Sequence, residues 1–250
     1  MKRRRYKSRR EKFQEPWITD DLGIDRGDHI RLELGNPHET GETSATYKGI
    51  SVAVAGGVPG EAVEVEITRR YPDSLTATVI EIDNPSSDRT EPLCPYYLAC
   101  SGCQWQHVAY DHQLTLKRER VQREIDKYEN LSHVVVDTTV ESEKRLGYRN
   151  HGRFTIGKYE DTGQVGYKNM VTRQFVRIDE CLLMDDKINE TIDLVQDRME
   201  GQTQMSIRVG SSTGSMLVQP QMDISGVNLV TGEQHYEEEV RGSRFRVAAS

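Results

Sequence analysis

The sequence has no long hydrophobic run and few of the side chains that fill a thick core. No stretch approaches the ~18–20 consecutive apolar residues of a membrane-spanning helix. The basic N-terminus is not followed by the apolar segment of a secretory signal. Aromatic residues make up 7% and hydrophobic residues 35% of the 250 residues, and the mean hydropathy is -0.70. These features predict small domains with solvent-exposed faces, a cytoplasmic location and no membrane partner.

Cysteine is equally scarce, and all four cysteines fall into one pattern. Cys94 is followed by five residues, Cys100, two residues and Cys103, and Cys181 comes after 77 more. A structural zinc site usually has two close cysteine pairs, whereas here Cys181 has no neighbouring partner. Three thiolates on a short loop and one distant thiolate are typical of a [4Fe–4S] cluster, in which each iron takes one cysteine. The spacing favours iron–sulfur over zinc and over thiols without metal, and both remain alternatives.

Charge is distributed unevenly along the chain. Residues 2–12 hold eight basic side chains and one acid, so this arm carries +7 although the whole chain carries -7. A basic arm neutralises phosphates and releases counterions from nucleic acid, so Arg3, Arg4 and Arg5 are candidate RNA contacts. The alternative is a solvated tail without a partner, and the acidic remainder is also what adaptation to high salt would produce.

The periodicity divides the chain into three parts. Residues 1–27 are the basic arm and a connector. Residues 28–83 alternate apolar and polar side chains in four or five short stretches separated by glycine and proline turns. This pattern predicts a small closed antiparallel β barrel of the oligonucleotide-binding (OB) type. Residues 84–250 form the third part, in which strands cluster before and after a helix, as in an α+β domain.

Within residues 84–250 the periodicity predicts two helices, over 112–129 and 184–199. The predicted strands are 133–140, 148–157, 164–168, 171–178, 203–209, 215–220, 224–230 and 243–248.

Residues 84–121 resemble a known segment. Asn84-Pro85-Ser86, Cys94-Pro95-Tyr96 and Cys100-Ser101-Gly102-Cys103-Gln104-Trp105-Gln106-His107 are similar to the iron–sulfur segment of the RNA (uracil-5-)-methyltransferases. These S-adenosylmethionine-dependent enzymes make 5-methyluridine in ribosomal and transfer RNA. Ser101 departs from the family's usual Cys-Gly-Gly-Cys. The resemblance covers roughly residues 28–250: the barrel looks like the family's TRAM RNA-binding domain, and Tyr148-Arg149-Asn150, Gly166-Tyr167 and Cys181 look like its central domain.

The resemblance implies a β barrel (OB-like, TRAM) followed by an α+β iron–sulfur domain, with a [4Fe–4S] cluster on Cys94, Cys100, Cys103 and Cys181. In the family, S-adenosylmethionine and the nucleophilic cysteine lie in a C-terminal Rossmann-like domain, for which no glycine-rich strand–loop–helix is found in this sequence. Every thiol here is already assigned to the cluster, so no catalytic residue is expected and the chain alone should be inactive.

The sequence therefore predicts the RNA-recognition portion of a ribosomal or transfer RNA (uracil-5-)-methyltransferase, which positions a uridine for methylation. A separately encoded methyltransferase domain is a candidate partner. Three alternatives remain: a stand-alone RNA-binding iron–sulfur protein of the TRAM type, an electron-transfer protein, and a metal with a purely architectural role.

Further RNA contacts are expected from exposed cations and aromatic rings in the second part of the chain. The candidate cations are Arg149, Arg153 and Lys168, and the candidate stacking platforms are Tyr148, Tyr167 and Trp105. Tyr148 and Trp105 could equally be core residues, and Arg149 could pair with an acid. His107 lies close to the cysteine loop and is expected to form hydrogen bonds rather than bind metal.

Overall fold

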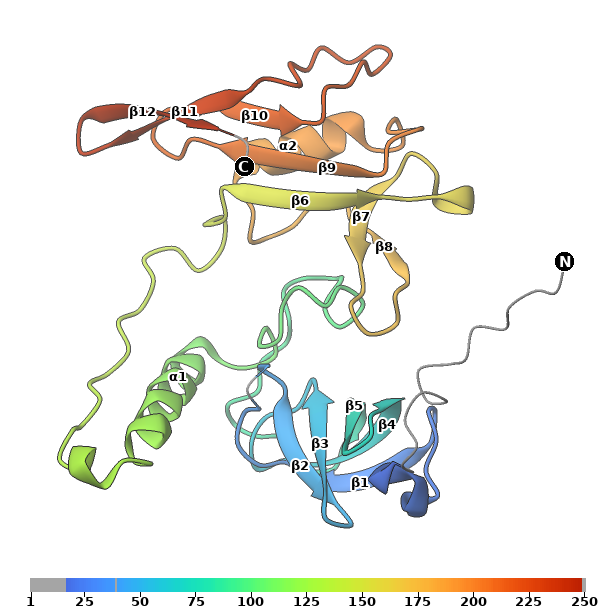
Figure 1. The fold of residues 1–250 in the computed structure, drawn as a ribbon, viewed down its shortest axis with the longest axis vertical. Coiled ribbons are helices and arrows are strands. Elements are labelled where there is room, and N and C mark those ends of the chain that lie inside the picture. The colour runs from blue at the N-terminus through green and yellow to red at the C-terminus, as the bar shows by residue number, and fades with distance from the viewer. Residues whose placement is uncertain (1–16, 39, 249–250) are drawn as a thin grey trace, which may run out of the picture. The chain divides into compact units, whose positions relative to one another are not determined.

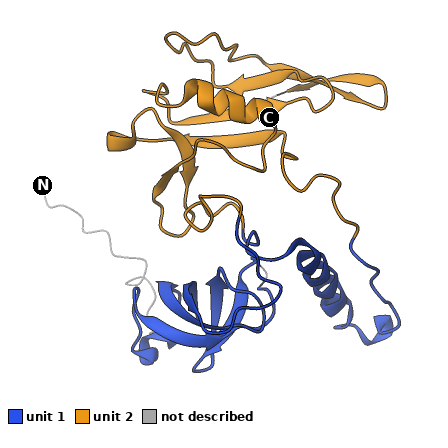
Figure 2. Cartoon of the chain, turned by 180° about the vertical axis from the view of Figure 1, so that it is seen from behind, with its two compact units in different colours: residues 1–92, 104–139 blue, residues 93–103, 140–250 orange. Residues whose placement is uncertain are grey.

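The computed structural model describes residues 17–38 and 40–248, so Arg3, Arg4 and Arg5 lie outside the described residues. The chain forms two compact units (Figure 2). The first unit contains residues 1–92 and 104–139, and the second contains residues 93–103 and 140–250. The three cysteines of the loop therefore belong to the same unit as Cys181, although the residues on either side of that loop belong to the other unit.

The first unit is built on a five-stranded sheet with strand order β1-β4-β5-β3-β2 (Figure 1). Its elements are η2 (Ile18–Leu22), β1 (His29–Glu33), β2 (Thr43–Tyr47), β3 (Ile50–Ala55), β4 (Ala62–Arg70) and β5 (Ser74–Ile82). The alternating apolar residues of these strands point to one side, where Val52, Val65 and Ile67 are fully buried. Half-buried strands of this kind are what the period-two pattern predicts.

The predicted closed antiparallel barrel is wrong. Strands β3 and β5 pair in parallel, with Val52 opposite Leu75, so the sheet is mixed. In the strand order, β1 and β2 are the two edges of a half-barrel. Strand β2 bonds to the residues that follow β1, where Gly35 N donates to Ser44 O at 2.7 Å and Ser44 N donates to Asn36 O at 2.8 Å. Side-chain alternation shows which residues are buried, but it is the same for parallel and antiparallel neighbours, so it could not reveal this arrangement.

A buried ion pair fixes the segment that follows this sheet. The carboxylate of Glu61 is 1% exposed and accepts hydrogen bonds from Arg89 Nε at 2.8 Å and Arg89 Nη2 at 2.6 Å. It also accepts hydrogen bonds from the backbone N–H groups of Val58 and Ser86. Burial raises the pKa of Glu61, but these hydrogen bonds and the charge of Arg89 outweigh that effect and hold the pKa below its ordinary value.

Helix α1 (Tyr110–Ile125) corresponds to the helix predicted over 112–129. It begins two residues earlier and ends four residues earlier than predicted, and the short helix η3 (Glu129–Leu131) follows it. The strand predicted over 133–140 is absent, although its β-branched residues favour a strand. The reason lies in Gln122 of α1, whose side chain accepts a hydrogen bond from Val136 N at 2.8 Å and donates one to Val134 O at 3.0 Å. The amide thus satisfies backbone groups that a neighbouring strand would otherwise bind.

The second unit contains an antiparallel five-stranded sheet with strand order β10-β9-β6-β7-β8. Its elements are β6 (His151–Ile156), η4 (Tyr159–Asp161), β7 (Val165–Lys168), β8 (Phe175–Arg177), α2 (Asp186–Val195), β9 (Gln204–Val209) and β10 (Met216–Gln219), followed by a separate hairpin of β11 (His235–Val240) and β12 (Ser243–Ala248). Helix α2 covers one face, where Ile188 and Ile192 pack against Phe154 and Ile207 in a hydrophobic core.

The structure of this unit differs from the predictions in three further ways. Residues 224–230 form no strand because Gly226 has φ +74° and Val227 N donates to Ile224 O, which makes a turn. Strand β11 was missed because its three consecutive glutamates hide the alternation. The predicted fold class, a β barrel followed by an α+β iron–sulfur domain, is also wrong in its second half: among the residues that the structure describes, no group of three or more His, Cys, Asp or Glu is placed to hold a metal ion.

Candidate functional site

The cysteine loop, residues 93–103, is held in a compact conformation by hydrogen bonds within its own backbone. Tyr97 N donates to Cys94 O at 3.1 Å, and Cys100 N donates to Tyr96 O at 2.7 Å. Leu98 has φ +65°, a left-handed conformation that reverses the chain direction between these two bonds. The backbone thereby brings Cys94 and Cys100 onto one short loop, as the sequence spacing predicts.

The region after β7 anchors this loop to the second sheet. Asn169 is 7% exposed, and its Nδ2 donates to Ala99 O at 2.8 Å and to Leu98 O at 3.3 Å. On the same side, Ser101 Oγ accepts a hydrogen bond of 2.9 Å from Met170 N. The serine that departs from the family's usual glycine is therefore used in this protein as an anchor for the loop.

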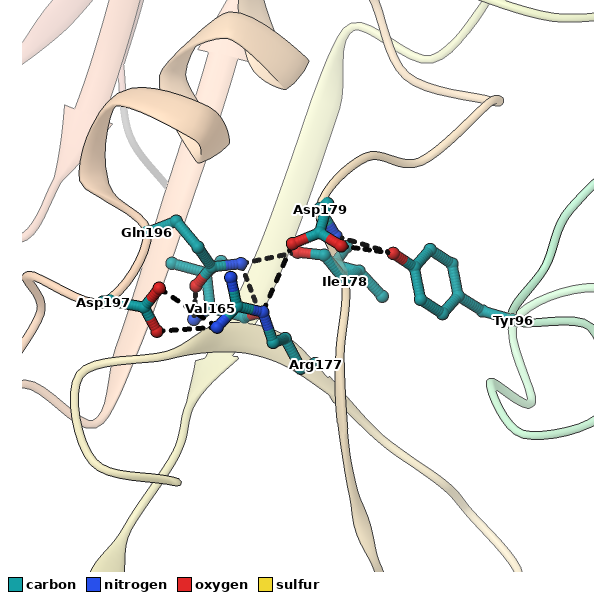
Figure 3. Close-up of polar contacts among 7 residues, drawn as sticks. All are labelled: Tyr96, Val165, Arg177, Ile178, Asp179, Gln196 and Asp197. Atoms are coloured by element: carbon teal, nitrogen blue, oxygen red, sulfur yellow. Dashed lines mark hydrogen bonds and ion pairs between the residues drawn. The ribbon is translucent and has the colours of Figure 1, made fainter. Parts of the chain in front are cut away.

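A second anchor runs through the hydroxyl of Tyr96 (Figure 3). It donates to Asp179 Oδ2 and accepts from Asp179 N, each at 3.0 Å. Asp179 also pairs with Arg177 at 3.2 Å, and Arg177 binds Asp197 at 2.7 Å. Figure 3 shows Gln196 beside this network, where it bonds to the backbone of Val165 and Ile178. The polar network holds the cysteine loop against the chain segment that leads into Cys181.

Helix α2 positions Cys181 directly. Asn189 Oδ1 accepts from Cys181 N at 2.9 Å, and Asn189 Nδ2 donates back to Cys181 O at 3.2 Å. Helix α2 begins shortly after the cysteine because Asp185 is its N-cap and accepts from Lys187 N at 3.0 Å. Burial raises the pKa of the Tyr167 hydroxyl, and the nearby Cys181 and Cys100 raise it further, so this ring lies close to the cysteines.

The four cysteines are free of disulfides. Burial raises the pKa of the Cys100 thiol, and the charges of Cys103, Cys181 and Cys94 raise it further. Burial, followed by Cys103 and Cys181, likewise raises the pKa of Cys94. The side chains thus gather from two distant segments, although the described residues are not arranged to hold a single ion.

The predicted RNA contacts within the described residues all belong to the second unit. Arg153 lies on β6, Lys168 ends β7, and Arg149 precedes β6, where its backbone bonds to Leu183 and Asp185. All three side chains are exposed. The alternative that Arg149 pairs with an acid is not seen, since no salt bridge of Arg149 is found within residues 17–38 and 40–248.

The predicted aromatic platforms separate into two groups. Tyr148 is 52% exposed and remains accessible to a base. Tyr167 instead packs on Phe154, with ring centroids 5.3 Å apart, and Trp105 packs against the buried Val58, Val108 and Leu116. These two rings are structural. His107 is 2% exposed with Nε2 2.9 Å from Gly57 O, which confirms the predicted hydrogen-bonding role.

Sequence reasoning missed the residues that assemble the cysteine site. Asn169, Asp179 and Asn189 are single polar residues without a distinctive spacing, and each becomes informative only when the fold brings it to the loop or to Cys181. The Gly166-Tyr167 pair, which resembles the family's central domain, was the one sequence signal for this site, since Tyr167 lies near Cys181.

Comparison with known proteins places these features in context. No family model matches the chain. An uncharacterised RNA methyltransferase of Synechocystis sp. is 26% identical over 209 residues, which is 77% of this chain and 45% of that protein. Another, from Clostridium acetobutylicum, is 31% identical over 178 residues, or 70% of this chain and 38% of that protein. The chain is similar to RNA methyltransferases. It spans less than half the length of these curated relatives.

A solved structure has a similar fold. The crystal structure of Pyrococcus abyssi tRNA (uracil-54, C5)-methyltransferase in complex with S-adenosyl-L-homocysteine matches with a TM-score of 0.58 and 19% identity, over 87% of this chain and 59% of that chain. At this identity the likeness shows the fold alone, and this fold replaces the predicted barrel and iron–sulfur domain. The comparisons do not support the expectation that a catalytic domain is missing. No helix in the described part of the chain is long and apolar enough to cross a membrane.

Proposed function

We propose that this chain recognises structured RNA for an S-adenosylmethionine-dependent RNA (uracil-5-)-methyltransferase of ribosomal or transfer RNA, acting in the cytoplasm. The observation that carries the proposal is the similarity to RNA methyltransferases over 70–77% of the chain. Exposed cations in the second unit support it, because Arg149, Arg153 and Lys168 can each bind a phosphate. Arg3, Arg4 and Arg5 are proposed as additional phosphate contacts from the basic arm.

The role of these residues is to bind and orient the RNA. A uridine must leave the base stack before its C5 atom can react, and unstacking costs a few kcal/mol. Cations that grip flanking phosphates can supply this free energy through contacts remote from the reacting base. S-adenosylmethionine supplies the methyl group, and we assign neither its binding nor the chemical step to a residue of this chain.

The four cysteines are proposed as ligands of a [4Fe–4S] cluster. The fit rests on the donor set itself: four thiols from two segments gather in one unit, and Cys94, Cys103 and Cys181 each affect the ionisation of Cys100. When bound, the cluster links the loop to Cys181 and adds folding free energy. Asn169, Ser101 and Tyr96 position the loop for that link.

The experiment that tests RNA recognition is an equilibrium binding titration of the full chain. The probes are unmodified transfer RNA and ribosomal RNA transcripts, with duplex DNA of equal charge as the control. We expect one RNA class to bind with a lower Kd than the DNA, which would also name the substrate class. Equal affinity for duplex DNA, or no binding at low salt, would contradict the proposal.

A further inference from the structure

The second sheet has one face without a helix, and its polar side chains lie on that face. Along β6 and β9 the buried residues, such as Phe154 and Ile207, face α2 and the core. The alternating residues therefore point to the opposite side. They are His151, Arg153 and Thr155 on β6, and Gln204, Ser206 and Arg208 on β9. Each of them is exposed or half-buried, so this face is accessible within the second unit.

Strand register brings three cationic or protonatable side chains of this face together. His151 lies directly opposite Arg208, and Arg153 lies directly opposite Ser206. Side chains at directly opposed positions have Cβ atoms roughly 5 Å apart, and residues two apart on one strand are separated by about 6.6 Å. His151 Nε2 is also 3.2 Å from Ser206 Oγ. His151, Arg153 and Arg208, which we call the β6–β9 trio, thus form one compact patch.

The β6–β9 trio is electrostatically unusual for this protein. The chain carries a net charge of -7, yet none of the six outward positions of β6 and β9 is an acid. Within residues 17–38 and 40–248, neither Arg153 nor Arg208 forms a salt bridge. By contrast, Arg177 on β8 is held by Asp179 and Asp197. Two arginines without carboxylate partners next to a histidine are ready to bind an anion.

We infer that the β6–β9 trio binds the sugar–phosphate backbone of the RNA, and that binding there is coupled to proton uptake by His151. The inference rests on the proposed function and deepens it by adding His151 and Arg208 to the interface. Two adjacent phosphates can be bridged by the guanidinium groups of Arg153 and Arg208. The imidazolium of His151 between them then donates a further charge-assisted hydrogen bond.

Proton coupling follows from the surroundings of His151. The charged groups that face it are Arg153 on its own strand and Arg208 on β9, and the adjacent Ser206 does not titrate. Burial, then Arg208 and Arg153, hold the pKa of His151 below its ordinary value in the free chain. A phosphate neutralises both arginines and attracts the imidazolium, so the pKa rises in the complex. Affinity must therefore increase as the pH falls through the pKa of the bound state.

The first arm of the test removes the arginines. Arg153→Gln and Arg208→Gln, singly and together, are titrated as full chains with an unmodified transfer RNA transcript over a range of salt concentrations. Each substitution should reduce the salt slope by about 1, and the double variant should raise Kd by about tenfold or more. Arg244→Gln, in the same unit but bound to Glu239, is the matched control and should change neither quantity. Circular dichroism melting verifies that the variants fold.

The second arm follows Kd between pH 8 and pH 6. The wild-type chain should bind RNA about tenfold more tightly at pH 6, since a hydrogen bond from a charged donor is worth about that factor. His151→Gln should lose this gain, whereas His235→Gln, a control in β11, should retain it. A purely structural role of His151 would not alter the pH profile. An identical profile in wild type and His151→Gln overturns the proton coupling.

The outcomes separate this inference from the proposed function. If wild type binds RNA tightly and the double arginine variant has the same Kd and salt slope, the β6–β9 trio is not the interface while the proposed function stands. If polyglutamate competes with RNA as strongly per charge as a nucleic-acid competitor does, the patch is a surface for acidic peptides and the inference is wrong. Failure of wild type to bind RNA overturns both.

Discussion

Asn169 Nδ2 donates a hydrogen bond of 2.8 Å to the carbonyl oxygen of Ala99, which lies 70 residues earlier in the chain. The same side chain accepts hydrogen bonds from Val171 N and Thr172 N, each at 2.8 Å. One buried amide therefore shapes the turn after β7 and also holds the cysteine loop. This dual contact explains how a loop flanked by residues of the first unit remains part of the second.

Asn169→Asp should detach the cysteine loop while retaining the turn. The carboxylate can still accept from Val171 N and Thr172 N, but it cannot donate to Ala99 O and faces that carbonyl oxygen instead. Loss of a buried hydrogen bond with an unsatisfied acceptor costs about 1–3 kcal/mol. Hydrogen exchange of residues 93–103 should accelerate. Asn150→Asp makes the same chemical change at an outlying contact, where Ser211 Oγ can turn from acceptor to donor, so it is the control and should leave that exchange unchanged.

Replacing Cys181 with Ser should abolish metal binding. Protein purified without oxygen should contain about four iron and four sulfide per chain, with the brown absorbance of the cluster. Cys181→Ser should lose most of both because the remaining three thiols are local to one loop. Ser101→Ala removes the hydrogen bond that Met170 N donates to the loop but removes no thiol, and because Asn169 and Tyr96 still anchor the loop it should retain iron. Stoichiometric zinc without sulfide in the wild-type chain would contradict the cluster assignment.

Deleting residues 2–12 should make RNA binding less sensitive to salt. The arm carries +7, so its removal reduces the number of counterions released on binding and flattens the plot of log Kd against log salt. A variant with the same segment replaced by a neutral serine–glycine sequence distinguishes charge from length. An unchanged slope would identify the arm as a tail that does not contact RNA.

Arg89→Met should strongly destabilise the first unit. It leaves the buried carboxylate of Glu61 without its cation, and breaking a buried pair in this way costs about 3–5 kcal/mol. Arg31→Met breaks exposed pairs with Asp83 and Glu64 and should cost no more than about 1 kcal/mol. Urea unfolding of both variants measures the difference, and equal costs would show that the Glu61 pair is not a special constraint.

The same pair predicts the direction of a pH effect. Because the pKa of Glu61 is lower in the folded state than its ordinary value of 4.5, the ionised pair stabilises the fold above that value. This contribution is lost as the pH falls through the folded-state pKa. Wild type should therefore lose more unfolding free energy between pH 7 and pH 3 than a Glu61→Gln variant, with the difference appearing below the ordinary value of 4.5. A parallel pH dependence of the two would contradict the assignment.

Sequence patterns located most strands and both long helices because burial of alternate residues is a local property. They identified β6, β7, β9 and α2 to within a few residues. Strand partners are not local, so the parallel pairing of Val52 with Leu75 could not be read from the alternation. The absent strand at 133–140 depends on a single amide, Gln122, which replaces a ladder that the β-branched residues would otherwise favour.

The candidate site shows the same division. The cysteine spacing predicts that the thiols act together, since three of them lie within ten residues of one another, and this stays a prediction. It did not indicate how Cys181 reaches them, because that depends on Asn189 in α2 and on the Tyr96–Asp179 contact. The sequence also could not distinguish exposed from packed aromatic rings. In the structure Tyr148 is exposed, whereas Tyr167 packs on Phe154.

The most direct test of RNA recognition by the second unit is photochemical cross-linking. The full chain is irradiated with a transfer or ribosomal RNA transcript that contains 4-thiouridine, and the cross-linked peptides are identified by mass spectrometry. We predict cross-links in residues 148–168, where Tyr148 is an exposed ring and Arg153 and Lys168 are exposed cations. Excess unlabelled RNA should suppress these cross-links and duplex DNA should not. Specific RNA cross-links confined to other segments, or no specific cross-link, would contradict the account.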